Sequence, residues 1–380
     1  MRPRSKVVLC VPVLLVAAAL SSCTVSRTAG PAGSTSSTAT TRTTGDPSNT
    51  SSPRTTTTTR PKPSTTTTAP PTTTTGANGV TYTIFPPASA STPLPKPAAL
   101  TPFASSPLPG EGVWQPAGRL VGGRPAVYVT TIEEPGSNQV AGVAWIDPHL
   151  LAATLYSGSL SPGGGPWAYT APVVPSQASS LVAAFNGGFQ ISSSNGGYYD
   201  YGQTVAPLRN GAASFVIFTN GSATVADWGR DVSMGPDIAA VRQNLTLLVD
   251  NGQPVAGLNP YDTSVWGSTL GGIPDVWRSG VGVTSDGGLV YVAGPALEVP
   301  QLAQLLQRAG AIRAMEMDIN PAWPTYATFS PVPASAPASA ANATNLVAGM
   351  AGTGARFFET WWDRDFIAMT ARPLIATGAG

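Results

Sequence analysis

Short apolar runs, broken by Gly, Pro, Asn and Asp, follow one another along most of the chain after residue 125. Runs of this length that are rich in β-branched and aromatic residues and bounded by turn formers predict β-strands. Turn-forming groups such as Asn220-Gly221 and Asp286-Gly287-Gly288 separate neighbouring runs and are typical of hairpins. The runs that we expect to form strands are Ala126–Glu133, Gln139–Ile146, Ala152–Tyr156, Leu181–Phe185, Ser214–Thr219, Thr224–Asp227, Asn244–Asp250, Gly280–Thr284 and Leu289–Ala293.

A helix is expected after the last of these runs. Pro300 suits the start of a helix, leucines follow at helical spacing up to Ala309, and Gly310 suits the position just past the end. The next segment, Ala311–Asp318, predicts a strand, so strand, helix and strand follow in the order of a crossover unit. A second, shorter helix is expected over Val232–Val241. The pattern predicts a mixed α+β domain with more strand than helix.

The first residues are basic, and an apolar run extends from Val7 to Leu20. A membrane-spanning helix needs about 20 apolar residues, so this run predicts a secretory signal over residues 1–22. The run ends in Leu20-Ser21-Ser22-Cys23, which resembles the bacterial lipoprotein box. That resemblance implies a lipid, diacylglycerol with palmitate-type chains, on Cys23 and attachment to the outer face of the cell membrane. The alternative is an ordinary signal peptide with a cysteine at this place by chance.

Residues 23–78 are almost entirely Thr, Ser, Pro, Gly and Ala, with threonine runs such as Thr55–Thr59. Such a segment buries too little apolar surface to offset its ordering entropy, so we expect a disordered stalk. Fully extended at about 3.1 Å per residue, it would reach roughly 170 Å. Residues 79–380 then form a single domain, with 79–125 as a less characteristic lead-in and 330–341 as a surface loop.

The whole chain has a formal net charge of +1, but its domain is acidic. Outside the signal and the stalk, 12 Lys and Arg stand against 18 Asp and Glu, a net charge of −6. This balance argues against nucleic acid as a partner. The single histidine, His149, excludes a multi-histidine zinc site, and the domain has no cysteine nucleophile. Neither a Gly-x-Ser-x-Gly elbow nor a P-loop is present.

Two glycine-rich segments are candidates for ligand binding. Asn186-Gly187-Gly188-Phe189 follows an apolar strand, where glycines let the backbone approach a ligand and Asn186 can both donate and accept hydrogen bonds. Asn195–Gly202 carries aromatic rings, among them Tyr198, of the kind that stack on sugars. The alternatives are a plain tight turn and a loop packed on its own aromatic rings.

Charged residues mark three further candidates. Arg209 and Arg278 each lie beside a turn, and an arginine fork grips a phosphate or carboxylate in two-point geometry. Glu316 and Asp318, two apart on one strand, should face the same way and could act as an acid/base pair. They could also bind a divalent cation or brace arginines, and each arginine could equally be a surface or loop-bracing residue.

In this order the clusters resemble the phosphodiester glycosidase family, whose members remove N-acetylglucosamine from a phosphodiester. Asn186–Phe189 matches the early Asn-Gly-Gly-Phe motif, and Arg278–Gly287 matches an Arg-x-Ala-Val-Gly-Val-Thr-x-Asp-Gly hairpin. Leu302–Asp318 matches the helix and strand that lead to the family's aspartate. The resemblance covers about Val182 to Arg372. It implies the family's fold and gives Asn186, Gly187, Gly188, Arg278 and Asp318 as site positions.

The chain departs from the family after Asp318. The family continues with Gly-Gly-Gly-Ser, where this chain has Ile319-Asn320-Pro321-Ala322-Trp323. Glycines there would let backbone amides cradle a phosphate or a sugar, which bulky Ile319 and rigid Pro321 cannot copy. Asn320 and Trp323 are the candidate substrate contacts in their place, with Trp323 as a stacking face.

Three functions compete. The leading hypothesis is a cell-surface hydrolase of a sugar–phosphate diester in a cell-envelope glycan: Arg278 and Arg209 hold the phosphate, Asp318 with Glu316 performs acid/base work, and Asn186 orients the sugar. It requires no cofactor, or a divalent cation. The second is a non-catalytic lipoprotein that binds wall glycan on the same fold. The third is a scaffold in the envelope. The hydrolase reading requires the site residues to converge on one cleft.

Overall fold

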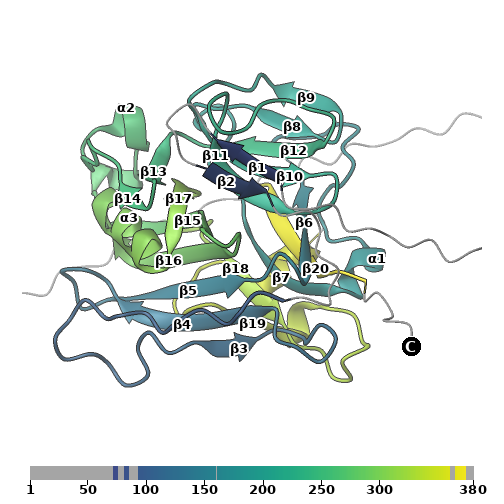
Figure 1. Ribbon diagram of the computed structural model, residues 1–380, viewed down its shortest axis with the longest axis horizontal. Helices are drawn as coiled ribbons and strands as arrows, with labels where there is room; N and C mark the ends of the chain where they lie inside the picture. Colours follow the sequence, from purple (N-terminus) through teal and green to yellow (C-terminus); the bar gives the residue numbers. More distant parts are fainter. Residues whose placement is uncertain (1–71, 76–80, 85–92, 160, 360–363, 374–380) are drawn as a thin grey trace, which may run out of the picture. The chain divides into compact units, whose positions relative to one another are not determined.

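The computed structural model of the protein describes residues 72–75, 81–84, 93–159, 161–359 and 364–373 (Figure 1). The predicted signal, Cys23 and nearly all of the predicted stalk lie outside these residues. The described residues belong to one compact unit, Thr65–Gly380. Within the predicted stalk, β1 (Thr72–Thr75) pairs antiparallel with β2 (Thr81–Ile84).

Three antiparallel sheets make up the rest of the unit, as the predicted strand-rich α+β fold requires. The eight-stranded sheet has the order β14 (Gln253–Pro254), β13 (Leu247–Asp250), β17 (Ala311–Glu316), β15 (Val276–Thr284), β16 (Leu289–Leu297), β5 (Val140–Ile146), β4 (Val127–Glu133) and β3 (Gln115–Ala117). One five-stranded sheet has the order β11 (Ala223–Asp227), β10 (Ala213–Phe218), β12 (Ile238–Gln243), β8 (Tyr198–Asp200) and β9 (Gln203–Ala206). The other has the order β19 (Ala343–Asn345), β18 (Tyr326–Phe329), β7 (Leu181–Asn186), β20 (Phe366–Ala371) and β6 (Leu151–Tyr156).

The largest core cluster takes side chains from all three sheets. Val281 and Tyr291 come from the eight-stranded sheet, Phe215 from the sheet of β10, and Phe185 and Ile367 from the sheet of β7, and all five are buried. Strands covered on both faces read as continuous apolar runs, which is why β7 and β10 bury every residue. The sheets therefore share one interior, and strand ends from different sheets meet around it.

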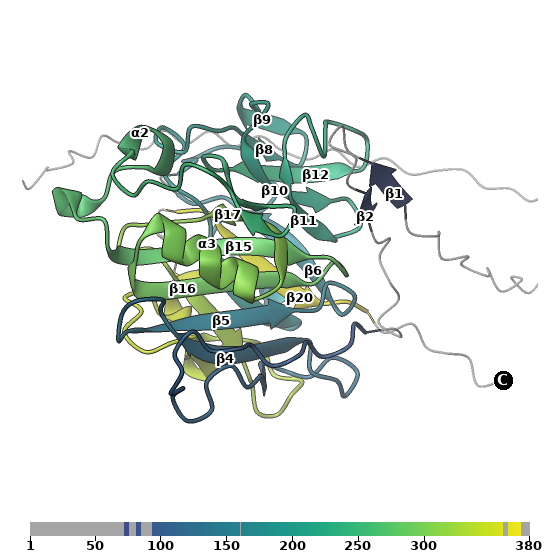
Figure 2. The ribbon, with the colours of Figure 1, turned by 60° about the vertical axis from the view of Figure 1, so that its left-hand side comes forward.

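The main helix, α3 (Val299–Arg308), covers the eight-stranded sheet, in front of β15 and β16 in Figure 2. A capping box between Glu298 and Gln301 begins it, and Gly310, with φ +93°, follows its end. The helix joins β16 to β17, two parallel strands that flank β15, so the predicted crossover unit is confirmed. None of the helices in the described ranges is long and apolar enough to cross a membrane.

The remaining helices are short: α1 (Pro175–Ala178), α2 (Thr263–Trp266) and the 3₁₀ turns η1 (Leu270–Gly272), η2 (Ala340–Asn342) and η3 (Gly354–Phe358). The helix predicted over Val232–Val241 is wrong. Gly235 and Pro236 break the segment, and the chain then forms β12, which lies between β10 and β8. Every residue of β12 is buried, so its sequence lacks the alternation that marks a half-buried strand.

Candidate functional site

An open cavity of about 380 Å³ lies where the ends of several elements meet. Its walls are the loop after β7 (Phe189, Gln190, Ser193), the segment around α2 and η1, the loop after β17 (Asp318–Asn320) and Arg364, just before β20. The volume is within the range of small-ligand sites, roughly 300–1,000 Å³. Among the described residues of the lining, Asp318 and Arg364 have charged side chains.

Asp318 and Arg364 form an ion pair on the wall of this cavity. Arg364 Nη1 donates to Asp318 Oδ2 at 3.1 Å, and the backbone N–H of Asn320 donates to Oδ1 at 2.9 Å. Arg364 Nε is buried and has no hydrogen-bond partner within the described part of the chain. This nitrogen is therefore closed off from the cavity, and only the exposed tenth of the Arg364 side chain can meet an anionic ligand, such as a phosphate oxygen.

The pKa of the Asp318 carboxyl group is shifted toward neutral pH. Burial raises its pKa to about 7, while the charge of Arg364 and the backbone N–H groups of Ile319 and Asn320 oppose the rise. A carboxyl group that titrates near neutrality can both take and give a proton under physiological conditions. Such a group in a cavity is a candidate catalytic acid or base.

A local irregularity directs Asp318 toward the cavity and Glu316 away from it. The strand β17 ends at Glu316, and the next two residues both form hydrogen bonds with Ser279 of β15. Met317 N–H donates to Ser279 O at 2.7 Å, and Ser279 N–H donates to Asp318 O at 2.9 Å. Met317 and Asp318 thus lie opposite the single residue Ser279, as in a β-bulge, and a bulge changes the direction of the side chains that follow it. Of these two carboxylates, which were predicted to face the same way and act as a pair, only Asp318 lines the cavity.

Glu316 is paired with Arg278 inside the protein. Arg278 Nη1 donates to Glu316 Oε1 at 2.6 Å, its Nε to Leu297 O at 2.7 Å and its Nη2 to Pro274 O at 3.0 Å. Both side chains are buried and neither lines the cavity. Burial raises the pKa of Glu316, and Arg278 opposes the rise. Arg278 therefore does not present its fork to a phosphate in this structure, contrary to its predicted role.

Asn186 joins strands from two sheets beneath the site. Its amide donates to Gly187 O at 2.7 Å and Ser279 Oγ at 3.1 Å, and its Oδ1 accepts from Tyr291 Oη at 2.6 Å and Thr325 N at 3.1 Å. The side chain is buried and does not line the cavity. It positions the loop after β7, and its sugar-orienting role stays a prediction.

The two glycines of the motif make room for buried neighbours, Gly187 for Asp365 and Gly188 for Asn244. A Cβ at Gly187 would lie 2.2 Å from Asp365 Oδ2, and the Gly187 N–H donates to Asp365 O at 2.8 Å. Gly188 O accepts from Arg364 Nη1 at 3.5 Å. Asp365 in turn forms a fully buried ion pair with Arg242, at 2.7 Å. The glycines thus permit a close backbone contact within the protein that fixes the arginine of the cavity.

Two predicted substrate contacts lie elsewhere. Tyr198 is fully buried in the main core, with its hydroxyl 3.0 Å from Ser157 Oγ, so it has no ring face for a sugar. Its pKa is raised well above the usual value by burial. Arg209 is exposed, but its guanidinium donates to Asn195, and it does not line the cavity. The sequence could not distinguish a core tyrosine from a surface one on the same glycine-rich loop.

The loop after Asp318 supplies the other predicted contacts. Asn320 lines the cavity, and its Oδ1 accepts the N–H of Ala322 at 3.1 Å. Trp323 carries the guanidinium groups of Arg356 and Arg364 over its ring, 4.8 and 4.7 Å from the centroid. Such cation–π contacts are worth about 0.5–2 kcal/mol each. Trp323 therefore holds Arg364 beside Asp318, a role that the sequence had not indicated.

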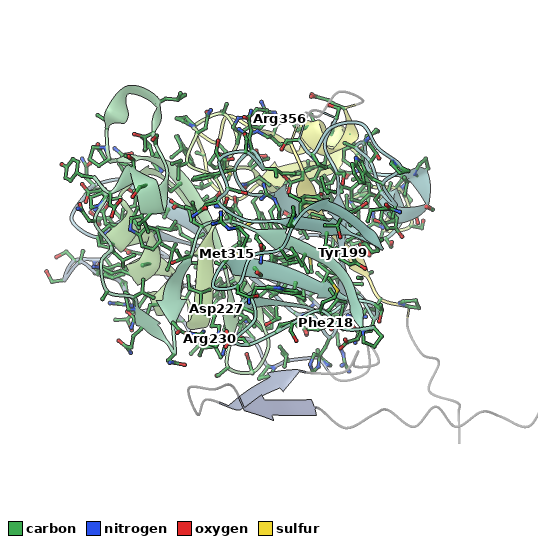
Figure 3. All side chains as sticks on the ribbon, turned by 90° about the horizontal axis from the view of Figure 1, so that it is seen from above. Tyr199, Phe218, Asp227, Arg230, Met315 and Arg356 are labelled. Carbon is green, nitrogen blue, oxygen red and sulfur yellow. The ribbon has the colours of Figure 1, made fainter. Side chains whose placement is uncertain are left out.

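A charge cluster lies outside the cavity wall. Arg230 binds Asp250 at 2.7 Å and Asp231 at 2.8 Å, and Arg313 of β17 binds Asp231 at 3.0 Å. Figure 3 shows Arg230 beside Asp227 at the end of β11. This network ties β11, β13 and β17 together. Among the described residues, no group of three or more His, Cys, Asp or Glu side chains is placed to hold a metal ion.

The predicted site residues therefore converge only in part. Asp318 and Asn320 line the cavity, whereas Asn186, Gly187, Gly188 and Trp323 support it from behind. Arg364 was not predicted. Its signal is weak: it follows two tryptophans and an aspartate directly before an apolar strand, and its partner Asp318 lies 46 positions earlier.

The strand-rich fold places a buried carboxyl group and an arginine at an open polar cavity. Such a site is suited to hydrolysis near an anion. The model of the phosphodiester glycosidase family matches residues 179–318, a segment that ends at Asp318 itself. The resemblance predicted from the motifs is confirmed for this segment. A comparison with curated proteins found no match.

Several solved structures show a distant likeness. The catalytic domain of zebrafish N-acetylglucosamine-1-phosphodiester α-N-acetylglucosaminidase, auto-inhibited by pro-peptide, is 14% identical with a TM-score of 0.39, over 68% of this chain and 88% of that one. A hypothetical protein from Synechocystis is 14% identical with a TM-score of 0.38, over 68% and 64%. A putative exported protein from Burkholderia pseudomallei is 13% identical with a TM-score of 0.31, over 66% and 76%.

Proposed function

We propose that this domain hydrolyses a sugar–phosphate diester in a cell-envelope glycan. The observation that carries the proposal is the pair of Asp318 and Arg364 on the cavity wall, at 3.1 Å, in a segment of the phosphodiester glycosidase family. The arginine places a positive charge on the cavity wall, and burial raises the pKa of the carboxyl group to about 7. These are the two properties that cleavage beside a phosphate needs.

In the proposed reaction, Arg364 binds a non-bridging oxygen of the phosphodiester and Asp318 acts as general base. Asp318 takes a proton from a water molecule, whose oxygen attacks the anomeric carbon of the sugar. The bond between that carbon and the bridging oxygen breaks, and the electron pair leaves with the phosphate. The products are a sugar with a free anomeric hydroxyl and a phosphate monoester, whose developing charge Arg364 stabilises.

We further propose that the domain works outside the cell, attached to the membrane by a lipid on Cys23. The support is the sequence alone: a signal-like segment over residues 1–22, the Leu-Ser-Ser-Cys motif, and the Thr-rich segment that follows. A domain attached in this way meets wall polymers before it meets cytosolic metabolites. Metabolic labelling with a palmitate analogue tests the anchor, because labelling of the wild type should be lost in Cys23→Ser. Equal labelling of both would contradict it.

Activity is tested with the purified protein on N-acetylglucosamine-1-phosphodiesters of sugars and on isolated wall polymers, with and without divalent cations. Asp318→Asn keeps the shape of the side chain but removes the base, so we expect turnover to fall by about 10²–10⁴-fold. Arg364→Lys keeps the charge but loses the fork and should raise KM most. Absence of turnover on every substrate, with and without cations, would rule out the hydrolase.

The second candidate is a glycan-binding protein without catalysis. The observation that favours it is Ile319, which is buried with Phe189, Leu245 and Val276 where the family has glycine. Backbone amides in this loop are thereby fixed by packing and have less freedom to follow a reacting phosphate. Binding to wall polysaccharide that is unchanged in Asp318→Asn, with no turnover in the wild type, would favour this candidate.

A further inference from the structure

A second cavity adjoins the first. It has the same volume, about 380 Å³, and is lined by Ser161, Pro162, Gln190, Ile191, Ser192 and Val205. Gln190 lines both cavities, so the loop after β7 is the ridge between them. A ligand long enough to cross this ridge would occupy both. Together the cavities offer about 760 Å³, which is still within the range of ligand sites.

The chemistry of the second cavity differs from that of the first. None of the described residues that line it has a charged side chain, whereas Asp318 and Arg364 line the first. Ser161, Gln190 and Ser192 supply hydroxyl and amide groups, and Pro162, Ile191 and Val205 supply apolar surface. An uncharged wall that is half polar and half apolar suits a neutral sugar, which presents hydroxyl groups at its rim and C–H groups on its faces.

The ridge is built to hold its shape. Ser193 N–H donates to Gln190 O at 2.8 Å, and Ser194 Oγ donates to Ile191 O at 3.0 Å. Ser194 is fully buried, and its carbonyl accepts the N–H of Leu245 at 2.7 Å. Gln190 and Ser192 are exposed, and within the described ranges their side chains make no hydrogen bond, so these polar groups are free to meet a ligand. A preformed site of this kind loses little entropy on binding.

We infer that the second cavity is a binding subsite for neutral sugar units of a glycan whose phosphodiester lies in the first cavity. The substrate is then an extended glycan and not a small diester. This inference rests on the proposed function for the role of the first cavity. The binding of a neutral glycan to the second cavity can be measured without any turnover, so the two can fail separately.

The test measures binding of sized oligosaccharides released from bacterial wall polysaccharide and freed of phosphate. Binding is followed by calorimetry with the full-length protein. Ser192→Trp fills the cavity from an exposed loop position, and Gln190→Ala removes the shared amide. The matched control is Thr131→Trp, which places the same side chain at an exposed position of β4, a strand that lines neither cavity. Circular dichroism checks that each variant is folded.

We expect neutral oligosaccharides to bind the wild type and Asp318→Asn equally. Ser192→Trp and Gln190→Ala should each weaken binding by about tenfold or more, and Thr131→Trp should leave it unchanged. In turnover, Ser192→Trp should raise KM for long phosphodiester glycans while leaving short diesters unaffected. Absence of binding to any neutral oligosaccharide, or equal binding by Ser192→Trp, Gln190→Ala and the wild type, would overturn the subsite. Binding without any turnover would overturn only the proposed hydrolysis.

Discussion

The buried pair of Arg278 and Glu316 should act on stability and not on chemistry. Their charged atoms lie 2.6 Å apart, and the side chains are 1% and 0% exposed. Glu316 Oε2 has no hydrogen-bond partner among the described residues, so Arg278 is the support of this carboxylate. Replacing Arg278 with Leu would leave the carboxylate alone in an apolar interior. Removing both side chains would leave no charge behind.

Breaking a buried ion pair from one side costs about 3–5 kcal/mol, which is a large part of a total stability of roughly 5–15 kcal/mol. We therefore expect Arg278→Leu to lower the free energy of unfolding by about 3–5 kcal/mol. The double variant Arg278→Leu with Glu316→Leu should be more stable than the single variant by about 2 kcal/mol or more, because hydrophobic replacement of a whole pair is often neutral.

Urea unfolding, followed by tryptophan fluorescence at two pH values, measures both effects. In Arg278→Leu the pKa of Glu316 in the folded state lies above its unfolded value of about 4.3. At pH values between these two pKa values, the folded state binds more protons than the unfolded state. Its stability should therefore fall as the pH rises, and the loss should be smaller near pH 5 than near pH 8. A single variant within about 1 kcal/mol of the wild type at both pH values would refute the reasoning.

Two further changes test the packing around the site. Gly187→Ala should lower the free energy of unfolding by about 3 kcal/mol, because its Cβ, 2.2 Å from Asp365 Oδ2, would displace the buried partner of Arg242. Urea unfolding should show a change within about 0.5 kcal/mol for the control Gly164→Ala, which meets open space; similar losses in both would contradict the account. Tyr198→Phe should cost about 1 kcal/mol through loss of its bond to Ser157 and leave glycan binding intact, and impaired binding would restore Tyr198 as a ligand contact.

Local patterns predicted the elements around the site well. The hairpin of β15 and β16 followed from the turn at Asp286–Gly288, and α3 from its leucine spacing and terminal glycine. The strand β12 was missed because burial on both faces removed the alternation on which the prediction depended. Each correct element is specified within about ten residues of sequence, whereas β12 is specified by its neighbours in the sheet.

The site was harder to predict because its pairs are distant in sequence. Asp318 was identified from its motif, but its partner Arg364 lies 46 positions later and carries no motif of its own. Arg278 stands beside a turn, which suggested exposure, yet Glu316, 38 positions away, draws it inside. A bulge opposite Ser279 then separates two carboxylates that simple alternation places on one face. Sequence spacing gives the candidates, and the tertiary contacts decide which of them reach the cavity.

The most direct test of the central claim is the pH dependence of kcat/KM for Asp318→Asn beside the wild type, on an N-acetylglucosamine-1-phosphodiester. Because burial raises the pKa of Asp318 to about 7 and the base must be ionised, wild-type kcat/KM should rise with pH and level off above about 7. Asp318→Asn should be lower by about 10²–10⁴-fold with no inflection there, while the exposed control Asp237→Asn follows the wild type. A wild-type profile in Asp318→Asn would contradict the account.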